Sequence, residues 1–145
     1  MKNTKTNVRR TNPKSTAEMH VLVVDDDEFQ CEVMQQTLAS IGVGRVTVAT
    51  SGQEALMKFA AESGAAIDLM VCDLHMPHMD GFEFMGAAAQ AGFQGALIIA
   101  SGQNEDIRRS AELVAQLRRL RVLGAVAKPV QKADLSRLIR MTLYP

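Results

Sequence analysis

The chain has 145 residues, of which 47% are hydrophobic and 22% are charged, so it can fold as one ordinary globular domain but not as two. No apolar run approaches the roughly 18 residues that span a bilayer, and residues 1–17 lack the hydrophobic stretch of a secretory signal. Composition therefore excludes a membrane protein and wholesale disorder, and we expect a soluble cytoplasmic protein.

The net charge is zero, but the charges are unevenly distributed along the chain. Residues 1–17 hold five basic side chains and no acid, whereas all 16 acidic side chains lie in the rest of the chain. We expect residues 1–17 to form a flexible basic tail and residues 18–145 to form the domain. Charge alone gives little support to nucleic-acid or membrane binding by this tail.

Apolar strand-like runs and helix-like segments alternate through the domain. Residues 20–24, HVLVV, are a continuous apolar run, and residues 28–40 place apolar side chains at helical spacing. A short strand with alternating valines is expected at residues 45–49. Ser51 and Glu54 then form a predicted capping box at the start of the next helix.

The same alternation continues to the end of the chain. The expected strands span residues 68–72, 96–100 and 122–127, and the expected helices span residues 82–91, 104–120 and 131–143. Five strands that are each followed by a helix predict an α/β fold, with a parallel sheet and helices on both faces. Cys31 falls in a helix and Cys72 in an apolar strand, so we expect two buried free thiols.

Polar side chains stand where four of the expected strands end. Asp25 and Asp26 follow the first strand, Asp73 the third, Ser101 the fourth and Lys128 the fifth. The carboxyl ends of parallel strands converge on one crevice, where open α/β sheets bind their ligands. Three carboxylates a few ångströms apart repel each other by several kcal/mol unless a cation or protonation neutralises them. We therefore predict a Mg²⁺ site with one carboxylate acting as a nucleophile toward phosphorus.

Structural roles compete with each acidic assignment. Acids at a helix N-terminus stabilise the helix dipole by about 0.3–1 kcal/mol each, a role that suits Asp27 and Glu28 better than the two acids before them. An aspartate at a strand end, such as Asp73, commonly caps a turn. Residues 80–81, Asp-Gly, already supply the turn chemistry here, which leaves Asp73 for the site.

Ser101 and Lys128 also have plain structural explanations. Ser101 could cap the helix that begins near Asn104. A lone lysine on a loop is usually solvated, although Lys128 precedes Pro129, which favours extended geometry and permits a cis bond. We favour the site roles, a hydroxyl and an ammonium that meet phosphoryl oxygens, because both residues stand at the same edge as the carboxylates.

Four motifs occur in order across residues 18–143: VLVVDDDE, VCDLHMPHMDG, LIIASG and GAVAKP. With these motifs the chain resembles the receiver domain of bacterial two-component response regulators. The resemblance implies a flavodoxin-like (βα)₅ fold with strand order 2-1-3-4-5.

The resemblance also implies the chemistry of the site. Asp73 would be phosphorylated from a phosphohistidine on a sensor histidine kinase or a phosphotransfer protein, with Mg²⁺ as the cofactor. Asp26 would bind Mg²⁺ directly and Asp25 largely through water, and the backbone carbonyl of His75 would supply another ligand. The protein would be a switch that modifies itself, not an enzyme that turns over an external substrate.

Ser101 and Lys128 would, by the same resemblance, contact the phosphoryl oxygens, and movement of Ser101 would shift the following loop and helix. A downstream protein would bind the face formed by residues 104–120, 122–127 and 131–143, and a homodimer on activation is left open. Many receivers carry an aromatic switch residue three positions before the lysine, whereas this chain has Ala125. Coupling must then pass through backbone or helix movement.

The interval from Ser101 to Lys128 is longer than in the commonest receivers, and the stretch looks like receivers joined to EAL-type cyclic-di-GMP phosphodiesterase domains. We expect a stand-alone receiver of that branch or part of a longer response regulator. The helix expected in this interval carries arginines that form either a solvated face or a partner surface. They are Arg108, Arg109, Arg118, Arg119 and Arg121.

One alternative function is a Mg²⁺-dependent phosphohydrolase with an aspartate nucleophile, of the haloacid dehalogenase type. Those hydrolases usually place a second aspartate two residues after the nucleophile, where this chain has His75. A flavodoxin-like cofactor binder is less well supported, because the chain has no tryptophan and a single tyrosine to stack on a flavin.

Overall fold

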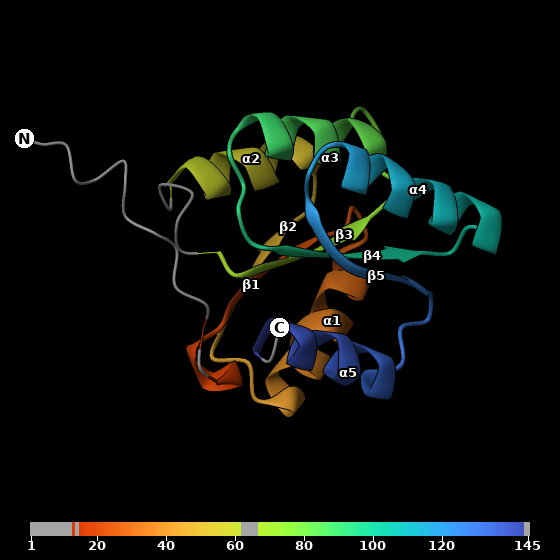
Figure 1. Ribbon diagram of the computed structural model, residues 1–145. Coiled ribbons are helices and arrows are strands. Elements are labelled where there is room, and N and C mark those ends of the chain that lie inside the picture. The colour runs from red at the N-terminus through yellow and green to blue at the C-terminus, as the bar shows by residue number, and fades with distance from the viewer. Residues whose placement is uncertain (1–12, 14, 62–66, 144–145) are drawn as a thin grey trace, which may run out of the picture.

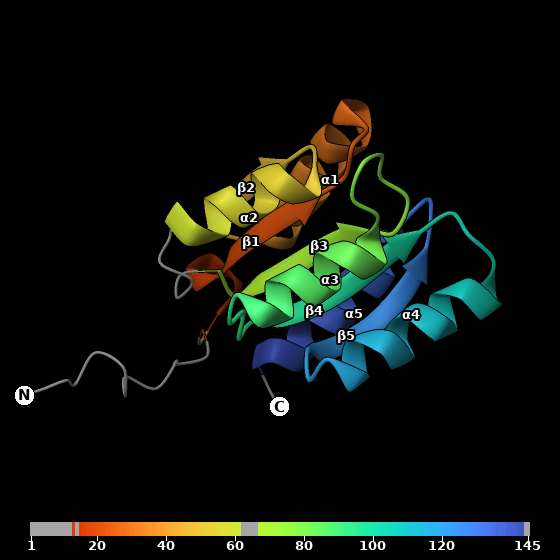
Figure 2. The ribbon, with the colours of Figure 1, turned by 90° about the horizontal axis from the view of Figure 1, so that it is seen from above.

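The computed structural model of the protein describes residues 13, 15–61 and 67–143. In this part of the chain, five parallel strands form one sheet in the order β2-β1-β3-β4-β5, as expected. The strands are β1 (His20–Val24), β2 (Arg45–Ala49), β3 (Leu69–Asp73), β4 (Ala96–Ser101) and β5 (Arg121–Ala127). They all point in one direction, so their carboxyl ends share one edge of the sheet (Figure 2).

Helices cover both faces of the sheet, which confirms the predicted layers. Their bounds are α1 (Glu28–Ile41), α2 (Gly52–Ala61), α3 (Gly81–Gln90), α4 (Glu105–Leu117) and α5 (Lys132–Leu143). Helices α2, α3 and α4 lie on one face, and α1 and α5 lie on the other (Figure 1). None of the helices in the described residues combines the length and apolar character that a bilayer crossing needs.

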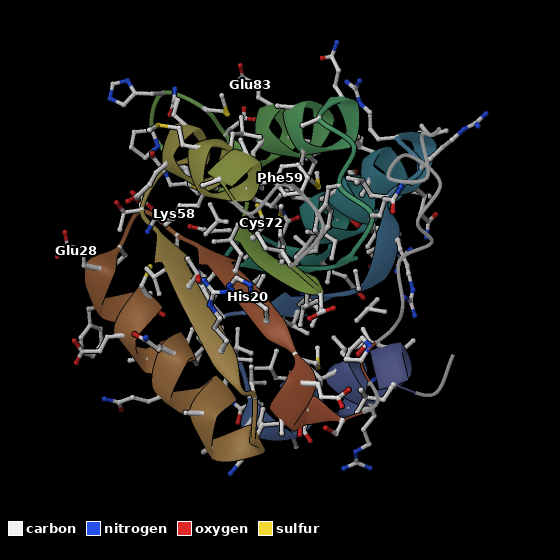
Figure 3. The ribbon with its side chains drawn as sticks, turned by 90° about the vertical axis from the view of Figure 1, so that its left-hand side faces the viewer. His20, Glu28, Lys58, Phe59, Cys72 and Glu83 are labelled. Atoms are coloured by element: carbon white, nitrogen blue, oxygen red, sulfur yellow. The ribbon has the colours of Figure 1, made fainter. Side chains whose placement is uncertain are left out.

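The core consists of two apolar layers, one on each face of the sheet. Leu22 points into the layer under α2, α3 and α4, while its neighbours Val21 and Val23 point toward α1 and α5. Every residue of β1, β3 and β4 is buried, as their largely apolar sequences predict, and the polar end residues His20, Asp73 and Ser101 are buried with the rest. Figure 3 shows Phe59 and Cys72 inside the first layer, and both cysteines are buried free thiols, as expected.

Strand β5 differs from the central strands because it is an edge. Most of its residues are partly exposed, and its pairing with β4 shifts between Leu97 and Ile98, where β5 contains one extra residue. The preceding helix is shorter than predicted. It ends at Leu117, Arg118 caps it, and Arg119 has a left-handed φ of 64°. Arg118, Arg119 and Arg121 therefore do not belong to the helix that was expected to carry them.

Two local features differ in detail from the sequence prediction. A 3-10 helix spans Thr16–Glu18, across the expected boundary of the basic tail, while residues 1–12 and 14 lie outside the described residues. At the start of α2, Ser51 Oγ accepts from Glu54 N (3.0 Å), as a capping box requires. The Glu54 carboxylate, however, accepts from Thr50 N (2.6 Å), one residue earlier than the box predicts.

Candidate functional site

The sheet brings the predicted site residues to one edge. Asp73 and Ser101 are the last residues of β3 and β4, and Asp25 and Lys128 directly follow β1 and β5. The register aligns these ends, since Asp73 pairs with Ala100 in neighbouring β4, and Ser101 is level with the residue before Lys128. The functional roles of these residues remain predictions, but their convergence is a property of the fold.

Three carboxylates form the acidic part of the site. One oxygen each of Asp25, Asp26 and Asp73 lies within 4.8 Å of the other two. Asp25 and Asp73 are buried, at 6% exposure each, whereas Asp26 is exposed. Asp27 has the structural role considered for it, because its Oδ1 accepts from Phe29 N and Gln30 N at the start of α1. Asp25 and Asp26, which precede it, therefore remain candidates for the site.

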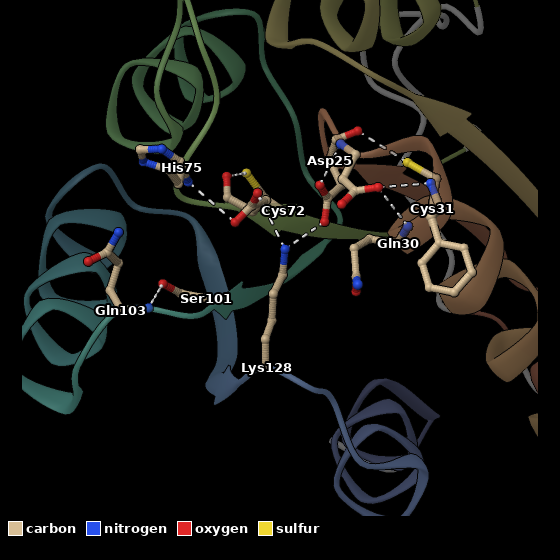
Figure 4. Close-up of polar contacts among 11 residues, drawn as sticks. Asp25, Gln30, Cys31, Cys72, His75, Ser101, Gln103 and Lys128 are labelled. Carbon is tan, nitrogen blue, oxygen red and sulfur yellow. Dashed lines mark hydrogen bonds and ion pairs between the residues drawn. The ribbon is translucent and has the colours of Figure 1, made fainter.

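Lys128 is the cation of the cluster (Figure 4). Its Nζ lies 2.7 Å from Asp25 Oδ2 and 3.4 Å from Asp73 Oδ2. Burial by itself would lower the pKa of Lys128, but the hydrogen bond to Asp25 and the charges of both aspartates outweigh burial and raise it. The Lys128–Pro129 peptide bond is cis. Three carboxylates against one ammonium leave the ionised cluster with two uncompensated negative charges.

The surroundings of Asp73 disfavour the ionised form of its carboxyl group. Burial raises the pKa of its carboxyl group, Asp25 raises it further, and the nearby Lys128 acts in the opposite direction. His75 N donates to Asp73 Oδ1 (3.3 Å), while the side chain of His75 is exposed. The His75 carbonyl as a metal ligand stays a prediction. A bound cation would stabilise the ionised carboxylate in this setting, and a covalent bond formed by one of its oxygens would remove the unfavourable charge.

Ser101 is fully buried and does not cap α4. Asn104 is the cap, with its Oδ1 accepting from Ile107 N (3.0 Å). Ser101 Oγ instead accepts from Gln103 N (2.9 Å), and this contact leaves the hydroxyl proton for donation to another group. The carbonyl oxygen of Gln103 in turn accepts from the Arg108 guanidinium. Ser101 is therefore connected to the first turn of α4 through the loop that follows β4.

An open crevice of about 400 Å³ lies over Asp25, Asp26, Asp73 and Lys128, and His75 and Gln103 also line it, whereas Ser101 does not. Sequence reasoning missed two supports of the crevice. Cys31 Sγ donates to Asp25 O (3.1 Å), and burial raises the pKa of this thiol to about 11, so it acts as a neutral donor. A Cβ on Gly81 would lie 2.6 Å from Leu74 Cα, so only glycine lets α3 approach the end of β3. The hydrogen bond of Cys31 depends on how α1 packs against the end of β1, which no spacing in the sequence indicates.

Comparisons with known proteins agree with the fold. The family model of the response regulator receiver domain matches residues 21–140. The cyclic di-GMP phosphodiesterase RocR of Pseudomonas aeruginosa is 29% identical over 122 residues, which cover 84% of this chain and 31% of RocR. The Regulator of RpoS of Escherichia coli is 30% identical over 128 residues, which cover 86% of this chain and 35% of that protein. The chain spans about a third of the length of these curated relatives.

Solved structures show the same architecture. A receiver domain protein from Clostridium thermocellum superposes with a TM-score of 0.74 and 25% identity, covering 86% of this chain and 94% of that chain. The CheX-CheY-BeF3-Mg+2 complex from Borrelia burgdorferi gives a TM-score of 0.75 at 22% identity, with 88% and 90% covered, and so supports the fold alone. With the family model matched from Val21 to Arg140 and the strand order 2-1-3-4-5, this chain belongs to the response regulator receiver domain family.

Proposed function

We propose that this receiver domain accepts a phosphoryl group on Asp73 from a histidine kinase or a phosphotransfer protein, with Mg²⁺, and thereby switches the conformation of its output face. A receiver fold is a signalling switch and not a classical enzyme. The observation that carries the proposal is the setting of Asp73. It is a buried carboxylate, it opens into a crevice, and it lies beside two further carboxylates and one ammonium.

The donor set fits Mg²⁺. Carboxylate oxygens are the hard ligands that this ion prefers, and the cluster has two uncompensated negative charges when ionised. Asp25, Asp26 and Asp73 would hold the ion, together with the His75 carbonyl. When bound, Mg²⁺ neutralises carboxylate charge and so permits an anionic phosphoryl group to approach Asp73.

The transfer itself requires only a positioned carboxylate and charge stabilisation. A carboxylate oxygen of Asp73 would bond to phosphorus as the phosphorus–nitrogen bond of the phosphohistidine breaks, and the electron pair would leave with the donor imidazole. Lys128 Nζ, 3.4 Å from Asp73 Oδ2, is within reach of oxygens on the transferred group. The buried hydroxyl of Ser101 would donate a hydrogen bond to another of these oxygens.

The conformational response would begin at Ser101. Ser101 is fully buried and does not line the crevice, so it would have to move toward a phosphoryl oxygen to donate to it. That movement would disturb its contact with Gln103 N and, through Gln103 O, the contact with Arg108 on α4. Ala125 on β5 has no aromatic ring to swing inward, so this route through the loop after β4 is the one that we propose for the signal. A protein partner, a further domain or a second copy would read the altered face of α4, β5 and α5.

Labelling with acetyl phosphate and Mg²⁺ tests the proposal directly. We expect intact-mass analysis to show the addition of one phosphoryl group, removed by hydroxylamine as acyl phosphates are, and we expect Asp73→Asn to abolish the addition. Asp80→Asn is the matched control, because Asp80 caps α3 outside the crevice and asparagine caps a helix as well as aspartate. Undiminished labelling of the Asp73→Asn variant would refute the assignment.

A further inference from the structure

A second cavity of about 230 Å³ lies beside the crevice, between α1 and the segment that follows β5. Val23, Val71 and Ala100 of the sheet form its floor, and α1 and residues 129–130 form its two sides. The residues that it shares with the crevice are Asp25, Gln30, Asp73 and Lys128. In Figure 4, Gln30 and Lys128 come from these two sides, α1 and the end of β5.

Most of the residues that line the cavity are apolar, which favours a ligand with a hydrocarbon ring. An engineered apolar cavity of about 150 Å³ binds benzene, so a cavity of this size has room for two fused rings. Phe29 and Val33, one turn apart on α1, line the cavity although they are 68% and 42% exposed. A bound ring would cover apolar surface that water now contacts, which favours binding.

The part of the cavity that adjoins the crevice selects a hydrogen-bond donor. The carboxylates of Asp25 and Asp73 line it, and an ionised carboxylate accepts about four hydrogen bonds. The oxygens of Asp25 already accept from Asp27 N and Lys128 Nζ, and lone pairs remain on both carboxylates. Lys128 also lines the cavity but compensates only one of the two carboxylate charges, so an anionic ligand would still be repelled, whereas a neutral N–H or O–H group would complement the free lone pairs.

We propose that this cavity binds a small planar aromatic molecule of one or two rings that carries one hydrogen-bond donor, and that this binding opposes divalent-cation binding in the crevice. The opposition follows because the donor would occupy lone pairs of Asp25 and Asp73 that the cation also needs. Coupling of this kind is reciprocal, so the bound cation must lower the affinity for the aromatic ligand by the same factor. The binding proposal does not rest on the proposed phosphorylation of Asp73, and only the coupling rests on the proposed cation site.

Indole is a suitable probe because the chain has no tryptophan and a single tyrosine, so indole emission can be followed almost without protein background. We expect a saturable shift of indole emission to shorter wavelength, with half-saturation at about 0.1–1 mM, as for a ligand of this size. N-methylindole, which lacks the N–H donor, should bind at least threefold more weakly. Emission that changes linearly with concentration, or equal binding of the two probes, would overturn the assignment.

Variants locate the binding in the cavity. Val130→Phe places a ring in the cavity and should weaken indole binding at least tenfold, whereas Met57→Phe adds the same ring on the exposed face of α2 and should change nothing. If circular dichroism shows that Val130→Phe does not fold, the Phe29→Ala variant tests the proposal instead, because Phe29 is exposed. We expect this variant to bind indole severalfold more weakly. Wild-type affinity in a folded Val130→Phe variant, or in Phe29→Ala, would refute the proposal.

The coupling is measured by repeating the indole titration at saturating Mg²⁺. We expect half-saturation to rise at least threefold, and an unchanged value would refute the opposition between the two ligands. None of these titrations uses a phosphoryl donor, so the result is independent of labelling at Asp73. Loss of labelling in Asp73→Asn with no indole binding to the wild type would uphold the proposed function and refute the cavity proposal.

Discussion

Replacement of Lys128 by methionine should destabilise the protein without Mg²⁺ and should make its stability depend on the ion. Methionine keeps an unbranched side chain of similar length but carries no charge. In the wild type, the Lys128 ammonium lies between Asp25 and Asp73, at 2.7 Å and 3.4 Å, and only 22% of its side chain is exposed. The variant would leave two buried carboxylates facing each other without a cation.

The magnitude follows from the geometry of the carboxylates. Oxygens of Asp25 and Asp73 lie within 4.8 Å of each other, which at an effective dielectric constant of 20 corresponds to a repulsion of about 3.5 kcal/mol. Protonation of Asp73, whose pKa burial already raises, would relieve part of this repulsion. We expect a loss of about 2 kcal/mol, which for a domain of this size lowers the Tm by about 8 °C.

The sign of the pH dependence follows from the same pKa. A carboxyl group whose folded-state pKa is raised destabilises the fold when it is ionised, so the penalty is present at high pH and disappears as pH falls through the folded-state pKa. The stability difference between Lys128→Met and the wild type should therefore be larger at pH 8 than at mildly acidic pH.

Thermal unfolding in EDTA and in Mg²⁺ measures both effects. Mg²⁺ should raise the Tm of Lys128→Met by more than that of the wild type, because the ion then compensates charges that the lysine compensated before. Lys132→Met is the matched control, since Lys132 is exposed on α5 and its loss should change the Tm by no more than about 2 °C. Equal Tm values for Lys128→Met and wild type in EDTA would refute the reasoning.

Three further variants test the metal site, the conformational response and a helix cap at the surface. Asp26→Ala should weaken Mg²⁺ binding at least tenfold by calorimetry, and unchanged binding would place the ion elsewhere. Ser101→Ala should still be labelled by acetyl phosphate but should show little change in amide exchange of α4 on labelling; a wild-type exchange response would contradict the proposed route. The hydrogen bond from Thr50 N lowers the pKa of Glu54 in the folded protein. At pH values above the unfolded-state pKa of Glu54, the Glu54→Gln substitution should therefore lower the free energy of unfolding by about 0.5 kcal/mol after solvent screening. At pH values below the folded-state pKa, it should not lower this free energy. Chemical denaturation at neutral and at acidic pH measures this difference, and a loss that is the same at both would refute the assignment to the charge.

The parallel sheet and the edge that carries the site were predictable from local sequence, whereas the strand order was predictable only through the resemblance to receiver domains. A strand buried on both faces is expected to be largely apolar, as β1, β3 and β4 are apart from one polar residue at an end of each, and parallel strands must place their carboxyl ends together. The helix boundaries were less predictable. Arginine has a high helix propensity, yet Arg119 takes a left-handed φ to turn the chain into β5, a consequence of sheet geometry that local sequence does not show.

Contacts that depend on side-chain packing were not predictable. The hydrogen bond of Cys31 Sγ to Asp25 O depends on how α1 seats against the end of β1. The apolar cavity likewise exists because the side chains of α1 and of residues 129–130 do not fill the space between them. Volumes of this kind are determined by all of the surrounding rotamers together, and no spacing in the sequence encodes them.

Lys128 links the two ligand sites that we propose, because it borders both the crevice and the cavity. In the protein alone its ammonium compensates Asp25 and Asp73, and a phosphoryl group on Asp73 would present a stronger anion within the same reach. The backbone N of Lys128 donates to Ser101 O (2.9 Å), so the two residues that would contact the phosphoryl group are held to each other by the pairing of β4 and β5. A shift of Lys128 toward the phosphoryl group would leave Asp25 with an additional lone pair facing the cavity. The phosphorylated protein should for this reason bind an aromatic donor more tightly than the Mg²⁺-bound, unphosphorylated protein does, and equal affinities would show that Lys128 does not move.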